Sequence, residues 1–65
     1  MYIDRDEIEE MLAGYYDFSE VTDEMWAKID EEVRLRMVDR GLDPQDDYDL
    51  YAAICDGAVG RAIHG

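Results

Sequence analysis

Carboxylates are the most abundant side chains in this sequence that could do chemistry. Eighteen Asp and Glu residues stand against six Lys and Arg residues among 65, so the formal net charge at pH 7 is −12. A carboxylate can serve as a general acid or base when an apolar pocket shifts its pKa. Nothing in the sequence places one in such a pocket. We therefore expect no catalytic residue, and we do not expect an enzyme.

The other reactive side chains occur once each, as Cys55 and His64. On a single helix, nine residues correspond to about 13 Å of rise, which keeps this pair out of contact. Cys55 is expected to be a small core residue. A lone cysteine cannot form an internal disulfide, and no Cys/His cluster is present for zinc.

The acidic run Asp43–Asp49 is the one segment that suggests a metal ion. It lacks the acid spacing, the central glycine and the final glutamate of an EF-hand loop. Weak divalent binding through charge alone stays open as an alternative. Gly57 and Gly60 are isolated and follow no strand, so they form no phosphate-binding loop. We expect no bound metal and no cofactor.

The net charge itself indicates a class of partner. A small polyanion repels nucleic acid and anionic membranes, and it attracts basic protein surfaces, including those that hold nucleic acid. We therefore expect a basic protein surface as the partner, and neither direct nucleic-acid binding nor membrane binding. Residues 1–10 lack the apolar stretch of a signal peptide, and no apolar run is long enough to span a membrane. The expected location is the cytoplasm.

Glycine and proline divide the chain into three helical blocks, predicted over residues 4–15, 23–40 and 44–63 of a single domain, 1–65. No alternating strand pattern or hairpin dipeptide occurs, so the predicted fold is an all-α three-helix bundle. In the first block Asp4 is a suitable N-cap. One helical face then carries the apolar residues Ile8, Met11, Leu12 and Tyr15.

The second block begins after Thr22, a suitable N-cap, and ends before Gly41, a natural C′ residue. Its apolar stripe consists of Trp26, Ile29, Val33 and Met37. The third block opens with Asp43 as N-cap and Pro44 at the first helical position. Its apolar face consists of Tyr48, Tyr51, Ala52, Cys55, Ala58, Val59, Ala62 and Ile63.

About half of the acids have an ordinary structural explanation. Acids at helix starts complement the helix dipole and cap free N–H groups. Others have a base four residues later, where an ion pair can form on the helix surface. These expected pairs are Glu24–Lys28, Asp30–Arg34 and Glu32–Arg36.

The remaining acids gather towards the N-terminus, where residues 1–33 hold twelve acids and two bases. We predict that a partner binds an acidic strip made of Asp6, Glu9, Glu10, Asp17, Glu20, Asp30 and Glu31. Tyr16 and Phe18 lie outside the clear apolar stripes, so they are either exposed anchors for the partner or core residues. A solvated face that only keeps the protein soluble explains the same acids.

Taken together, size, charge and helicity give the chain a resemblance to a class of viral proteins. It resembles the small, acidic, helical proteins of bacteriophages that block host CRISPR or restriction machinery, some of which are similar to DNA in charge layout. The resemblance extends over the whole chain and assigns no individual residue. It implies an inhibitor that mimics nucleic acid and occludes the basic nucleic-acid-binding site of a host protein.

A second apolar sector supports a different class of function. It consists of Leu35, Val38, Leu42, Leu50 and Ile54. These residues either pack the three helices together or form a contact surface. In the second case the chain is a structural or regulatory interaction module, with a homodimer as one form of it.

Overall fold

Three α-helices and no strand make up the fold, in a computed structural model that describes all 65 residues. α1 spans Arg5–Met11, α2 spans Asp23–Asp39 and α3 spans Tyr48–His64. A short 3₁₀ helix, η1, covers Phe18–Glu20 between α1 and α2. The predicted all-α three-helix bundle is confirmed.

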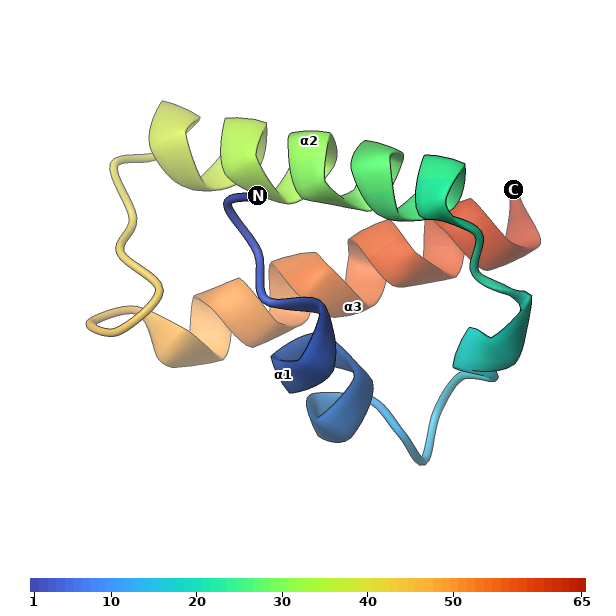
Figure 1. Cartoon of the computed structure of the whole chain (residues 1–65). Coiled ribbons are helices and arrows are strands. Elements are labelled where there is room, and N and C mark those ends of the chain that lie inside the picture. Colours follow the sequence, from blue (N-terminus) through green and yellow to red (C-terminus); the bar gives the residue numbers. More distant parts are fainter.

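The two long helices form the body of the molecule. α2 and α3 run side by side in opposite directions, and the shorter α1 lies at an angle beside α3 (Figure 1). The whole chain measures 31 × 21 × 19 Å. α1 and the connector after it therefore cover one side of a helical hairpin.

The core is entirely apolar. α2 contributes Trp26, Ile29, Val33 and Met37, as its stripe predicted, and α3 contributes Tyr51, Cys55, Ala58 and Val59. The N-terminal third supplies the other four buried residues, Ile3, Ile8, Leu12 and Val21. No polar or charged residue is fully buried, so every carboxylate keeps some contact with solvent.

Local sequence signals set both ends of α2. The Thr22 side chain accepts a hydrogen bond from the Met25 N–H at 3.2 Å, so it caps the helix as predicted. At the other end Gly41 adopts φ +65, where a side chain would be strained. The N–H groups of Gly41 and Leu42 donate to the carbonyls of Val38 and Met37, the two bonds of a Schellman motif.

The first helix is shorter than predicted. It ends at Met11, with Leu12 as its C-cap, instead of continuing to residue 15. The N–H groups of Tyr15 and Tyr16 both donate to the Leu12 carbonyl, which closes a tight turn around Gly14. This turn removes Tyr15 from the helical face, so the prediction that Tyr15 is a core residue is wrong: its exposed fraction is 77%.

The third helix begins later than predicted, at Tyr48 and not at residue 44. The Asp43 carboxylate caps the N–H groups of Gln45 and Asp46, and the Asp47 carboxylate in turn accepts from the Asp43 N–H. These local bonds favour a separate turn over a continuous helix. Tyr48, expected in the core, therefore sits at the helix start and is 48% exposed.

Candidate protein-binding surface

α1 carries four acids on seven residues. Asp4 caps the helix by accepting from the N–H groups of Asp6 and Glu7, as predicted. Ile8 is the one fully buried residue of α1, so most of the helix surface faces solvent. The acids Asp6, Glu7 and Glu10 are exposed and Glu9 is half-buried. We call this set the α1 acids: Asp6, Glu7, Glu9 and Glu10.

The one base of α1 does not neutralise these acids. The Arg5 Nη1 lies 3.2 Å from the Asp23 carboxylate at the start of α2. Its guanidinium carbon also lies 5.0 Å from the centre of the Trp26 ring, within the range of a cation–π contact. Arg5 is thus committed to fastening α1 onto α2, and the α1 acids have no basic partner.

The connector after α1 holds the next two acids of the predicted strip. Asp17 caps η1: its carboxylate accepts from the Ser19 hydroxyl at 2.6 Å and from the Ser19 N–H at 3.1 Å. These bonds lower the pKa of Asp17, the hydroxyl bond most. Asp17 therefore has a structural role that the sequence analysis did not assign. Glu20, the second acid of the connector, is exposed and has no partner.

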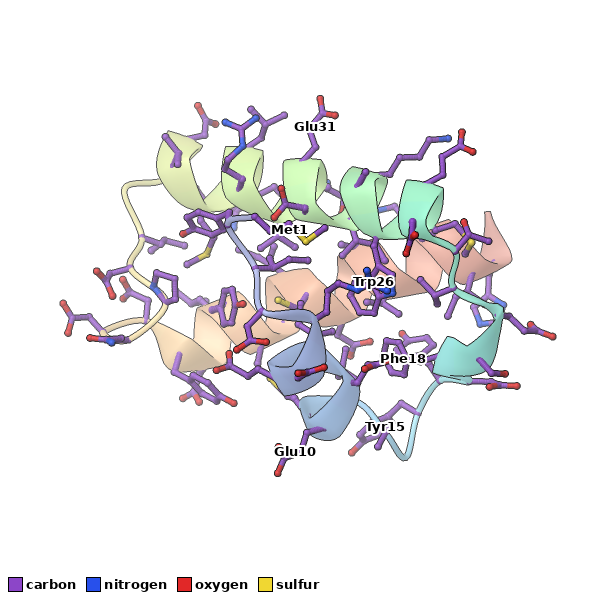
Figure 2. All side chains as sticks on the ribbon, viewed as in Figure 1. Met1, Glu10, Tyr15, Phe18, Trp26 and Glu31 are labelled. Atoms are coloured by element: carbon purple, nitrogen blue, oxygen red, sulfur yellow. The ribbon has the colours of Figure 1, made fainter.

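The open question about Tyr16 and Phe18 is settled in favour of packing. Both side chains are half-buried against the core. The Phe18 ring stacks on Trp26, with 5.8 Å between ring centres and 12° between planes (Figure 2). The Tyr16 hydroxyl donates to the Asp56 carboxylate, and this bond raises the pKa of Tyr16.

A glycine in α3 makes room for Tyr16. A Cβ atom added to Gly60 would lie 3.0 Å from the Tyr16 hydroxyl oxygen. The sequence analysis described Gly60 only as an isolated glycine that follows no strand. The tyrosine ring of the connector occupies that space, which no spacing pattern within α3 could have indicated.

The last two acids of the strip lie on α2 and face different surroundings. Asp30 accepts a hydrogen bond from the Ile3 N–H at 3.0 Å, so it anchors the N-terminus. Glu31 is exposed and points away from the body, on the opposite edge of the molecule from Glu10 (Figure 2). The structure therefore groups Asp6, Glu9 and Glu10 on α1 and separates Glu31 from them.

Only one of the three expected ion pairs within α2 is present. The Arg36 Nε lies 3.7 Å from the Glu32 carboxylate, whereas Glu24–Lys28 and Asp30–Arg34 do not form. Arg61 of α3 also binds Glu32, donating from its Nε at 3.0 Å. Hydrogen bonding by Arg61 is the largest cause of the lowered pKa of Glu32.

Most acids remain without any partner. Of the eighteen, eight have an ion pair or accept a hydrogen bond, which leaves ten. The ten are Asp6, Glu7, Glu9, Glu10, Glu20, Glu24, Glu31, Asp39, Asp46 and Asp49. Four of them are the α1 acids, so this short helix is the most concentrated source of unpaired negative charge.

Comparison with known proteins gives no match, whether to a family model, to a curated protein or to a solved structure. The candidate surface therefore rests on its own residues and their geometry.

The single cysteine and the single histidine have different surroundings. Cys55 is fully buried, and burial raises the pKa of its thiol to about 11, while His64 is exposed at the end of α3. No cluster of three His, Cys, Asp or Glu side chains is arranged to hold a metal ion. None of the helices combines the length and the apolar character needed to cross a membrane.

The second apolar sector is divided in the structure. Leu42 and Ile54 pack against the core, whereas Leu35, Val38 and Leu50 are 50%, 65% and 49% exposed. α2 thus contacts a long neighbour on one side only, and its outer face keeps two large apolar side chains in solvent.

Sequence reasoning did not predict the surface depressions of the fold, among them a groove of about 260 Å³ along the α2–α3 seam. It is lined by Met25, Lys28, Ile29, Glu32, Ala58, Arg61 and Ala62. The small residues Ala58 and Ala62 on the α3 face were the available signal, because short side chains leave space between two helices. The Glu32–Arg61 pair lies along the same seam.

Proposed function

We propose that this protein binds a basic surface of another protein and thereby occludes a nucleic-acid-binding site. The observation that carries the proposal is the set of α1 acids. Four carboxylates occupy seven residues of a capped helix, none of them has a basic or hydrogen-bonding partner, and Arg5 is engaged elsewhere. Such a helix presents negative charge at no cost in broken intramolecular pairs.

The spacing of these acids suits a site that normally holds a nucleic-acid backbone. Helical neighbours three or four residues apart place their side chains about 5–6 Å from each other. A row of carboxylates at that spacing competes with phosphates for the same Lys and Arg side chains. Charge complementarity of this kind acts mainly by speeding association, which makes binding strongly dependent on salt.

The biological setting that fits this activity is inhibition of a nucleic-acid-processing defence. In size, acidity and helicity this chain resembles the small, acidic, helical bacteriophage proteins that block CRISPR or restriction machinery. We propose the same role here, exerted in the cytoplasm of the host on a nucleic-acid-binding protein or complex.

The test combines capture with a functional readout. The protein is immobilised, partners are captured from bacterial lysate at low and at high salt, and the captured protein is assayed for nucleic-acid binding with and without this chain. We expect a nucleic-acid-binding protein that is lost at high salt and that releases its nucleic acid when this chain is added. Partners that bind no nucleic acid, or that keep it, would contradict the proposal.

A matched pair of variants identifies the surface. The first carries Asp6→Asn, Glu9→Gln and Glu10→Gln, and the control carries Asp39→Asn, Asp46→Asn and Asp49→Asn. Both remove three unpaired acids, so their net charge is the same. We expect the α1 variant to associate more slowly and with a weaker salt dependence than the control. An equal loss of association rate in both variants would mean that the net charge acts without a defined binding surface.

A second candidate function is self-association through apolar contacts. The exposed Leu35 and Val38 on the outer face of α2 are the observation that favours it. In this case the chain is a helical interaction module that forms a homodimer. Sedimentation over a range of concentrations tests the idea, with Leu35→Gln as the variant expected to shift the protein towards monomer. A monomer at every concentration would remove this candidate.

A further inference from the structure

Tyr15 is the most exposed aromatic residue of the chain. It is 77% exposed, whereas each of the other six aromatic side chains is at least half covered. Its backbone is nevertheless fixed, because its N–H donates to the Leu12 carbonyl at 2.9 Å. The next residue, Tyr16, is fastened to Asp56 on α3. The ring of Tyr15 is therefore presented from an ordered turn and does not belong to a frayed end.

The same chain contains an example of what an aromatic ring beside a carboxylate can hold. Arg5 lies over the Trp26 ring at 5.0 Å while its guanidinium donates to the Asp23 carboxylate. An aromatic face and an acid together hold one arginine. Figure 2 shows Tyr15 and Glu10 both at the lower edge of the molecule, where Tyr15 supplies an exposed aromatic ring and Glu10 an exposed carboxylate that forms no ion pair.

We infer that Tyr15 is a specificity residue that receives an arginine of the partner, while Glu10 and its neighbours on α1 supply the opposite charge. This inference rests on the proposed function and names the chemistry of the partner surface: it bears arginine in preference to lysine. A guanidinium is planar and weakly hydrated, so it stacks on an aromatic face more readily than an ammonium group. Carboxylates alone attract both bases.

The test uses an oligo-arginine peptide and an oligo-lysine peptide of equal length, each carrying the same dye, with binding measured by fluorescence anisotropy at low salt. We expect the wild-type protein to bind the arginine peptide more tightly, by about two- to fivefold, as for a solvent-exposed cation–π contact. Tyr15→Ala is expected to abolish the preference without weakening the lysine peptide. Tyr15→Phe is expected to keep it, because the ring remains.

Tyr48→Ala is the control, since Tyr48 is also half-exposed but its hydroxyl contacts Met11 and its ring lies beside Tyr51. This variant is expected to keep the preference for arginine. Equal affinity for the two peptides, or an unchanged preference in Tyr15→Ala, overturns the role of Tyr15 and leaves the proposed function standing. Failure of both peptides to bind at low salt overturns the proposed function as well.

Discussion

Glu32 differs from every other acid of this chain in having two basic partners on two helices. Arg36 lies one turn away on α2, and Arg61 reaches it from α3. Its side chain is 29% exposed, so the interaction is partly shielded from water. This carboxylate is thus a link between the two long helices, whereas most of its acidic neighbours are not.

Replacing Glu32 should therefore have an effect that depends on pH. Its pKa in the folded protein lies below the usual value, so it contributes stability above the unfolded pKa and loses that contribution as pH falls through the folded value. We expect Glu32→Gln to lower Tm by about 2–4 °C at neutral pH. The difference from wild type should shrink as the pH falls below the usual glutamate pKa, and it should disappear below the lowered pKa of Glu32. Thermal melting followed by circular dichroism measures both.

The adjacent Glu31 provides the control for this prediction. It is exposed and unpaired, so Glu31→Gln should leave Tm unchanged or slightly raised at neutral pH. A loss in Glu31→Gln as large as in Glu32→Gln would show that the two-helix link has no particular importance.

Among the three helices, the ends of α2 could be predicted because each is determined by a residue next to it in the sequence. Thr22 and Gly41 lie directly at its ends, and their preferences do not depend on the rest of the fold. The ends of α1 and α3 depend on choices that a pattern cannot resolve, such as the turn after Leu12 and the carboxylate bonds of Asp43. When the apolar pattern of a helix is extended past such a turn, the residues beyond it are assigned to the wrong side, as happened for Tyr15.

The sequence could predict which acids are exposed at the candidate site, but not which of them lie together. Exposure of the acids follows from their charge, and all seven of the acidic strip keep contact with solvent. The separation of these acids in space does not follow from their charge. For example, the Asp30 carboxylate accepts a hydrogen bond from the N–H of Ile3, 27 residues away in the sequence. Contacts of that range depend on the tertiary fold, and spacing patterns within one sequence do not reveal them.

The two inner glycines of α3 give a prediction about the contact between the connector and α3. Replacing glycine by alanine within a helix stabilises it by about 1 kcal/mol when there is space. At Gly57 the nearest atom is a guanidinium nitrogen of Arg61 at 3.1 Å, and Arg61 is also bound to Glu32, so Gly57→Ala should gain only part of this. At Gly60 the added carbon meets the Tyr16 hydroxyl at 3.0 Å, so Gly60→Ala should gain little or lose. Urea denaturation measures both.

A double substitution isolates the cause. Without the hydroxyl, the nearest Tyr16 atoms lie 3.7 Å and 3.8 Å from the added carbon, which is ordinary contact. Gly60→Ala should therefore become stabilising in a Tyr16→Phe background. If Gly60→Ala stabilises the protein by the same amount in the wild-type background, the connector does not lie against α3 as described.

The whole molecule carries a charge that its own pairs do not offset. Only Asp23 and Glu32 form ion pairs with bases, and the net charge is −12 on a chain with a radius of gyration of 10.9 Å. Repulsion among unpaired carboxylates acts against the folded state, because unfolding moves them apart. Stability should then respond to ionic strength more than to any single exposed acid.

We expect Tm to rise by several degrees between low salt and about 0.5 M salt, where the Debye length is below about 8 Å. The variant with Asp6→Asn, Glu9→Gln and Glu10→Gln should melt higher than wild type at low salt and gain less from added salt. Sodium and potassium chloride should act alike, since screening depends on ionic strength. A fall in Tm with salt would mean that the ion pairs outweigh the repulsion.

The reactivity of the Cys55 thiol can report how often the folded protein opens. The thiol is fully buried beside Tyr51 in the middle of α3, so an alkylating reagent can reach it only when the helices separate. The rate of alkylation therefore counts opening events without any added label. A partner that binds only the folded chain should slow this rate by the factor 1 + [L]/Kd, where [L] is the free partner concentration. Mass spectrometry of the alkylated protein would then give the partner's affinity while leaving every surface residue unaltered.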